Sequence, residues 1–231
     1  MIQGLETSPE APASILRVIE RRSLREIAVE QIRVAVEHGE LKAGERLTEL
    51  GFARRLGVAQ ATIREALMEL EHQGFVERNG PRETRITVLT RRQINDIYVV
   101  RTRLEMLAVE LLVARERADL TGAETQYEKM LGASRVEQHA EFYRADLDFH
   151  RALWRATGNA SLAEALERLA PKLFAFVIIR HARATREKLV ATAETHGTLL
   201  ALIRSRELTA ATELMEASME RAWIDDAELP E

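Results

Sequence analysis

The chain has 231 residues, of which 46% are hydrophobic and 30% charged, a composition that excludes an intrinsically disordered protein and allows one large domain or two modest ones. The chain has no cysteine, which excludes disulfides and thiol chemistry. It also has no long apolar run, and Met1–Ser14 lacks the pattern of a secretion signal, so we expect a cytoplasmic protein with no membrane partner. The formal net charge of −4 is uneven, because residues 15–92 carry 15 Lys and Arg against 12 Asp and Glu, whereas residues 93–231 carry 18 against 23, which suits a DNA-binding module followed by a different one.

Three helices are predicted in the first third of the chain. Apolar residues recur at helical spacing from residue 24 to residue 38 and stop at Gly39. A short helix fits Thr48–Leu56, with Thr48 as its N-cap, and a third fits Gln60–His72. Gly57 lies between the last two helices, where a small residue lets them cross closely. This pattern predicts a helix-turn-helix.

A β-hairpin is predicted after the third helix. Residues 75–78 and 84–88 are β-like runs on either side of the turn Asn79-Gly80-Pro81. A helix, a helix-turn-helix and a hairpin in this order predict a winged helix-turn-helix domain over residues 15–90.

The remainder, residues 91–231, is predicted to form an all-helical bundle, because no strand pattern interrupts it. An amphipathic helix begins near Ile94 and ends near Arg117. Pro171 is expected to kink or break the helix that contains it. The other helical stretches fit Ala123–Leu131, Val136–Thr157, Leu162–Arg183, Arg186–Ser205 and Leu208–Ile224. The predicted fold class is therefore mainly α.

The N-terminal end of the third helix carries the side chains expected to read DNA. Gln60, Thr62 and Arg64 are polar and lie among the groups free to face the major groove. Three further candidates for DNA contact precede this helix: Arg46, Thr48 and Arg54. The two arginines among them are expected to contact phosphate. The hairpin offers Asn79, Gly80 and Arg82 to the minor groove or the DNA backbone, with a solvated charged hairpin as the alternative.

Several ordered motifs over roughly residues 20–90 resemble the GntR family of bacterial regulators. They are Arg46-Leu47-Thr48-Glu49, Leu56-Gly57-Val58, Arg64-Glu65-Ala66-Leu67-Met68-Glu69-Leu70 and Gly74-Phe75-Val76. The second half resembles the FCD ligand-binding module of the FadR-like branch, in a shorter, VanR-like form. The resemblance implies a homodimer that binds a palindromic operator, acts as a repressor, and is released or retuned by a small effector, often a carboxylic acid.

The recognition helix departs from the family pattern at two positions. Ala59 replaces a serine, which removes a helix N-cap at a cost of about 1 kcal/mol. Gln60 replaces an arginine, and because glutamine pairs bidentately with adenine, we expect an operator shifted from guanine toward adenine, or read less strictly, at that position. The alternative is that Gln60 touches only phosphate. Arg64 matches a family position used for DNA contact, with a surface salt bridge to Glu65 or Glu69 as the alternative.

A metal site is predicted in the second domain. Asp146 and His150 are four residues apart and project from one helical face, within a segment, Asp146-Leu147-Asp148-Phe149-His150, that resembles the FCD signature. The resemblance makes His196 the next ligand of one divalent ion, Zn, Ni or Mn. Ser218 stands where many relatives have another histidine, so the expected affinity is weaker. A salt bridge or hydrogen-bonded core pair is the alternative, and His181 is a substitute ligand without motif support.

Two residues are predicted to contact the effector. Arg101 matches a family arginine that faces the effector cavity, where a guanidinium grips a carboxylate bidentately; a salt bridge across the bundle is the alternative. Asn159 follows Gly158 and is either a ligand contact or a helix N-cap.

Two other functions are compatible with the amino-acid sequence. An Asp/His/His set with an open position is also typical of metal-dependent enzymes, although no nucleophile motif or second carboxylate base stands out. An architectural DNA-binding protein with a purely structural dimer domain is the second rival. We expect no enzymatic activity.

Overall fold

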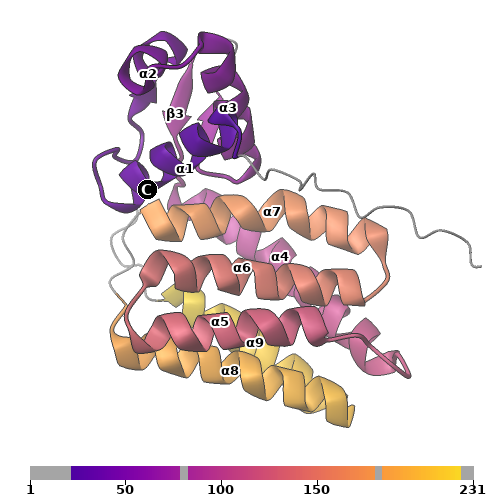
Figure 1. The fold of residues 1–231 in the computed structure, drawn as a ribbon. Coiled ribbons are helices and arrows are strands. Elements are labelled where there is room, and N and C mark those ends of the chain that lie inside the picture. Colours follow the sequence, from indigo (N-terminus) through magenta and orange to yellow (C-terminus); the bar gives the residue numbers. More distant parts are fainter. Residues whose placement is uncertain (1–21, 79–82, 180–183, 225–231) are drawn as a thin grey trace, which may run out of the picture.

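The computed structural model describes residues 22–78, 83–179 and 184–224, with side chains as far as Met219. Figure 1 shows a small N-terminal domain resting on one side of a bundle of long helices. The predicted wing residues Asn79, Gly80 and Arg82, and the substitute ligand His181, fall outside the described residues.

The N-terminal domain begins with three helices, α1 (Leu24–Glu37), α2 (Glu49–Leu56) and α3 (Gln60–His72). Ser23 and Glu26 form a capping box at the start of α1. Thr48 caps α2 by accepting a hydrogen bond from the Gly51 amide, as predicted from the sequence. Gly57 ends α2 in the left-handed conformation, with φ of 66°, and turns the chain into α3. The helix-turn-helix is therefore built by local signals.

The wing is a three-stranded antiparallel sheet with the order β1-β3-β2. The predicted hairpin is formed by β2 (Val76–Arg78) and β3 (Thr84–Ile86). A third strand, β1 (Arg46–Leu47), pairs with β3 and was not predicted. It has only two residues, which is too short for an alternating pattern to be visible in the sequence. β1 runs directly into the cap of α2, so it fixes the start of the helix-turn-helix.

Six helices form the C-terminal bundle, and no strand is found in the described part of this domain. They are α4 (Arg91–Ala114), α5 (Thr121–Arg135), α6 (His139–Ala156), α7 (Ala160–Ile179), α8 (Arg186–Ser205) and α9 (Leu208–Ile224). None of the helices among the described residues has both the length and the apolar character needed to cross a membrane.

Helix α7 lies between the two domains (Figure 1). On one side Phe174 packs in the bundle with Trp154 of α6. On the other side Ala175, Ile178 and Ile179 belong to the core of the N-terminal domain. A helix that is buried on two sides is apolar over most of its surface, and ten residues of α7 are buried.

Pro171 was expected to kink or break its helix; no break occurs, because α7 continues through it from Ala160 to Ile179. A proline inside a helix costs about 3 kcal/mol, and packing of α7 against both domains offsets this cost. The two domains also meet at Gly74. Gly74, with φ of 80°, lies so near α7 that a Cβ atom on it would come within 2.5 Å of the Lys172 backbone. The side chain of Lys172 also donates to Glu77 in β2 at 3.0 Å.

Candidate metal centre and nucleic-acid interface

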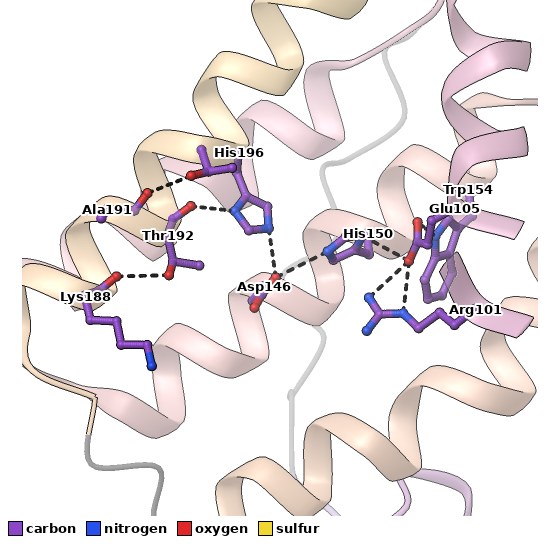
Figure 2. A network of polar contacts seen from close by, with 10 residues as sticks. Arg101, Glu105, Asp146, His150, Trp154, Lys188, Ala191, Thr192 and His196 are labelled. Atoms are coloured by element: carbon purple, nitrogen blue, oxygen red, sulfur yellow. Dashed lines mark hydrogen bonds and ion pairs between the residues drawn. The ribbon is translucent and has the colours of Figure 1, made fainter. Parts of the chain in front are cut away.

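The predicted metal ligands come together inside the bundle. Asp146 and His150 lie one turn apart on α6, and His196 reaches them from α8 (Figure 2). All three are buried, and one ligand atom from each lies within 4.8 Å of the others. Oδ1 of Asp146 is 3.0 Å from Nε2 of His196 and 3.5 Å from Nε2 of His150. The three ligand atoms therefore face one small volume.

His196 is oriented by the backbone of its own helix. Its Nδ1 lies 2.8 Å from the carbonyl oxygen of Thr192, so Nδ1 carries a proton and donates it there. This leaves Nε2 to face Asp146. Burial opposes the charged imidazolium, but the Asp146 carboxylate outweighs it and raises the pKa of His196. Burial likewise opposes ionisation of Asp146, but His196 outweighs it and the pKa of this carboxyl is lowered.

Oδ1 of Asp146 is buried and makes no hydrogen bond, although both imidazoles lie within ion-pair distance of it. Buried polar atoms are rarely left in this state, so each one needs an explanation. Ligand atoms about 2.1 Å from a tetrahedral ion lie roughly 3.4 Å from one another, close to the separations between Asp146 and the two imidazoles. Carboxylate and imidazole are suitable ligands for Zn, Ni or Mn, so the residues present fit a divalent ion.

Glu105 of α4 is part of this cluster and was missed from the sequence. Its Oε1 lies 3.2 Å from Nδ1 of His150, and its Oε2 accepts a hydrogen bond from the indole of Trp154 at 2.9 Å. Glu105 is completely buried, which opposes its ionisation, but His150 and Arg101 outweigh this and lower its pKa to about 2. The available signal was an acidic residue one turn after Arg101 on an otherwise apolar face. Glu105 stands behind His150, as the outer partner that orients a metal-binding imidazole does.

Arg101, expected to bind the effector, lies in the same network. Nε and Nη2 donate to Oε1 of Glu105 at 3.1 and 3.0 Å, and the guanidinium lies 4.8 Å from the centre of the Phe174 ring. The salt bridge weighed as an alternative is thus present, but within α4 rather than across the bundle. Nη1 is not used in this pair, so Arg101 keeps donors for a ligand.

Asn159 is not brought to the cluster. It is exposed beyond the end of α6, and its Oδ1 accepts from the Leu162 amide at 3.1 Å. This hydrogen bond makes Asn159 the N-cap of α7, which was the alternative weighed for it, and its contact with the effector stays a prediction.

The recognition helix presents its predicted readers on an exposed face. Gln60 and Arg64 are exposed and Thr62 is half-buried, whereas Ile63 and Ala66 of the same helix are in the core. The salt bridge of Arg64 goes to Glu49 of α2 at 2.8 Å, not to Glu65 or Glu69.

The remaining predicted DNA contacts lie around this helix. Arg46 on β1 and Arg54 on α2 are exposed, and Thr48 uses its hydroxyl as the α2 cap. Ala59 occupies the N-cap position of α3 and makes no side-chain hydrogen bond there, as expected from the missing serine.

Comparison with known protein families accounts for both halves of the chain. Residues 96–221 match the FCD domain, and residues 24–86 match the bacterial regulatory proteins of the gntR family. These two segments contain the buried cluster and the helix-turn-helix, respectively.

Curated relatives are named as transcription regulators, not as enzymes. The uncharacterized HTH-type transcriptional regulator YdhC of Bacillus subtilis is 33% identical over 139 residues, which cover 59% of this chain and 62% of the relative. The gluconate operon transcriptional repressor of the same organism is 27% identical over 161 residues, covering 68% of this chain and 65% of the relative. The chain thus spans less than two thirds of the length of these curated relatives.

Solved structures share the fold. McbR/YncC of E. coli superposes with a TM-score of 0.68 at 21% identity, covering 87% of this chain and 96% of that one. A putative GntR regulator from Rhodococcus sp. RHA1 superposes with a TM-score of 0.69 at 20% identity, covering 86% of this chain and 95% of that one. Both halves of the chain match the same two-domain arrangement, in the same order and over nearly its full length. The chain belongs to the GntR family of bacterial regulatory proteins, in the branch whose second domain is an FCD domain.

Proposed function

We propose that this protein is a transcriptional repressor that binds a palindromic operator as a homodimer and is controlled by a carboxylic acid metabolite in its C-terminal domain. It acts in the cytoplasm, where a bacterial regulator meets its DNA. That its FCD domain has the shorter, VanR-like form stays a prediction. The family membership supports DNA binding and regulation. The effector class is supported by the buried arginine beside the metal cluster.

One observation carries the proposal: α7 touches both the buried cluster and the DNA-binding domain. The ring of Phe174 lies against Arg101 and is 6.0 Å from the ring of His150. One turn later, Ile178 packs in the core of the winged helix. A ligand that moves Phe174 would therefore also shift the part of α7 that packs against the domain carrying α3. Allosteric control requires an element of this kind, with contacts to both sites.

Asp146, His150 and His196 would hold one divalent ion. Bound there, the ion supplies a positive charge that attracts an anionic ligand. The residues present contribute the rest. Arg101 offers Nη1 to a carboxylate, Glu105 fixes both Arg101 and His150, and the rings of Phe149 and Phe174 exclude water from the ligand atoms. Ser218 stands where the family resemblance implies a further histidine, so water or the effector would complete the ligand set of a bound ion.

The test is a binding measurement that links the two sites. Purified protein is titrated onto operator duplexes selected from a random library and onto scrambled duplexes, with and without a panel of carboxylic acids. The proposal expects preference for a palindrome, affinity that falls steeply with salt, and an acid that weakens operator binding. Operator must weaken binding of that acid by the same factor.

Two outcomes would reject the proposal in different ways. Equal affinity for selected and scrambled duplexes would remove the DNA-reading function. Operator binding that no acid alters would favour the architectural protein weighed above. The variant Arg101→Lys serves as a matched control for the effector step, because it keeps the positive charge but loses the planar donor set.

A further inference from the structure

Glu49, the first residue of α2, binds two of the side chains predicted to read DNA. Its carboxylate accepts from Nε of Arg64 at 3.0 Å and from Nη2 of Arg64 at 2.8 Å. It also accepts from Nε2 of Gln60 at 2.9 Å. These hydrogen bonds from Arg64 and Gln60 lower the pKa of Glu49, so the carboxylate is ionised at neutral pH.

The contact decides which edge of Arg64 remains available. A guanidinium has two donor edges, one made of Nε and Nη2 and one made of Nη1 and Nη2. Glu49 occupies the first edge bidentately. The second edge keeps two parallel N–H groups, and this pair matches O6 and N7 of guanine. The Arg64 side chain is still 55% exposed, so this edge is open to a ligand.

The same contact fixes the amide of Gln60. A carboxylate only accepts hydrogen bonds, so Nε2 must face Glu49 and Oε1 must point away from it. The reverse orientation would bring Oε1 against the carboxylate. Oε1 and the second hydrogen of Nε2 then form the acceptor and donor pair that adenine requires. Gln60 and Arg64 are four residues apart on α3, so both present these edges on one helical face.

We propose that Glu49 is a specificity-determining residue that positions Arg64 to read guanine and Gln60 to read adenine. This inference rests on the proposed DNA-binding function. Glu49 acts through the two readers and need not touch a base itself. Fixing both side chains before binding reduces the rotamer freedom lost on the DNA, so the effect falls on sequence selectivity.

The test is selection of binding sites from a random duplex library by the unaltered chain, four single variants and one double variant. Arg64→Ala identifies the guanine position read by Arg64. Glu49→Gln removes the charge that holds both readers. Glu65→Gln removes the same charge from an exposed neighbour of Arg64 on α3, and serves as the matched control. Glu49→Asp keeps the charge and the favourable acidic start of α2 but shortens the reach to Arg64 and Gln60.

The proposal expects Glu49→Gln and Glu49→Asp to reduce the preference for guanine at the Arg64 position about tenfold, the size of a weak bidentate contact. Glu65→Gln should leave this preference unchanged while raising affinity for all duplexes equally. In an Arg64→Ala background, Glu49→Gln should change nothing further at that base. Thermal melting of each variant checks that it is folded.

An unchanged guanine preference in folded Glu49→Gln or Glu49→Asp would overturn the inference. Equal effects of Glu49→Gln and Glu65→Gln would do the same, because the role of Glu49 would then be only its charge. If the wild-type protein itself selects no sequence, the proposed DNA-binding function has failed instead, and the selection with wild-type protein separates these cases.

Discussion

Arg101 and Glu105 lie one turn apart on α4 and meet inside the bundle, where Nε and Nη2 of the arginine donate to the same carboxylate oxygen at 3.1 and 3.0 Å. Both side chains are almost completely buried. The pair connects the predicted effector-binding arginine to the metal cluster, because Glu105 also contacts His150. A carboxylate ligand entering this site would meet an arginine that already has one carboxylate partner.

Glu105→Gln should destabilise the protein by about 3–5 kcal/mol, because it leaves the buried Arg101 without its counter-charge. The amide nitrogen also replaces one acceptor, so either Arg101 or the Trp154 indole loses its partner. Urea denaturation measures the free energy of unfolding. Glu110→Gln, an exposed position on the same helix, is the matched control and should change it by less than 0.5 kcal/mol, roughly the ordinary surface effect. If Glu105→Gln lowered the free energy of unfolding by less than about 1 kcal/mol, as loss of a surface ion pair does, Glu105 would not be the buried counter-charge of Arg101.

Asp146→Asn should abolish binding of the divalent ion, because it removes the only carboxylate among the three described ligands. Wild-type protein incubated with zinc and desalted should retain one equivalent and melt at a higher temperature than after chelation, since binding to the folded state alone stabilises it. Asp148→Asn is the control, because Asp148 is on the same helix but is half exposed and pairs with Arg151. Equal metal content in the two variants would place the ion elsewhere.

Gly74→Ala should destabilise the protein more than Gly57→Ala. Both glycines have positive φ, 80° and 66°, so alanine costs roughly 1–2 kcal/mol of backbone strain at either site. Only at Gly74 would the new Cβ collide with the backbone of α7, at 2.5 Å from Lys172, which adds roughly 1–3 kcal/mol. Unfolding free energies of the two variants check this. Equal losses would mean that the N-terminal domain does not dock closely on α7.

Glu37 should make stability fall as pH rises above the ordinary carboxyl pKa of 4.5. Burial raises the pKa of Glu37, outweighing the charges of Arg33 on its own helix and of Arg144 on α6, while Glu30 reinforces the rise and His38 opposes it. Between the two pKa values the folded state holds a proton that the unfolded state has released, so the free energy of unfolding declines with pH.

Removing this carboxyl should remove that part of the pH dependence. Urea unfolding between pH 4 and pH 8 should show a shallower decline in Glu37→Gln than in wild-type protein. Glu40→Gln provides the comparison, since Glu40 is exposed and pairs with Arg55 on the surface. A decline of the same steepness in Glu37→Gln would assign the pH dependence to other groups.

Much of the fold could be predicted because its signals are local. The bounds of α3, α8 and α9 follow from helical periodicity and from residues at the helix ends. Thr48 and Gly57 mark the turn of the helix-turn-helix by their own chemistry. Asp146 and His150 share a face because four residues make about one helical turn. The family resemblance, not periodicity, grouped His196 with them.

The amino-acid sequence by itself determined the two-domain order, the helices and the set of side chains able to hold a metal or read DNA. Only the tertiary structure decided which of these side chains meet. Packing placed Glu105 behind His150 and Glu49 between Gln60 and Arg64. It also kept α7 intact through Pro171, because burial on two sides outweighs one lost backbone hydrogen bond. The physical reason is distance along the chain: periodicity and caps act within a few residues, whereas these contacts join groups that only folding brings together.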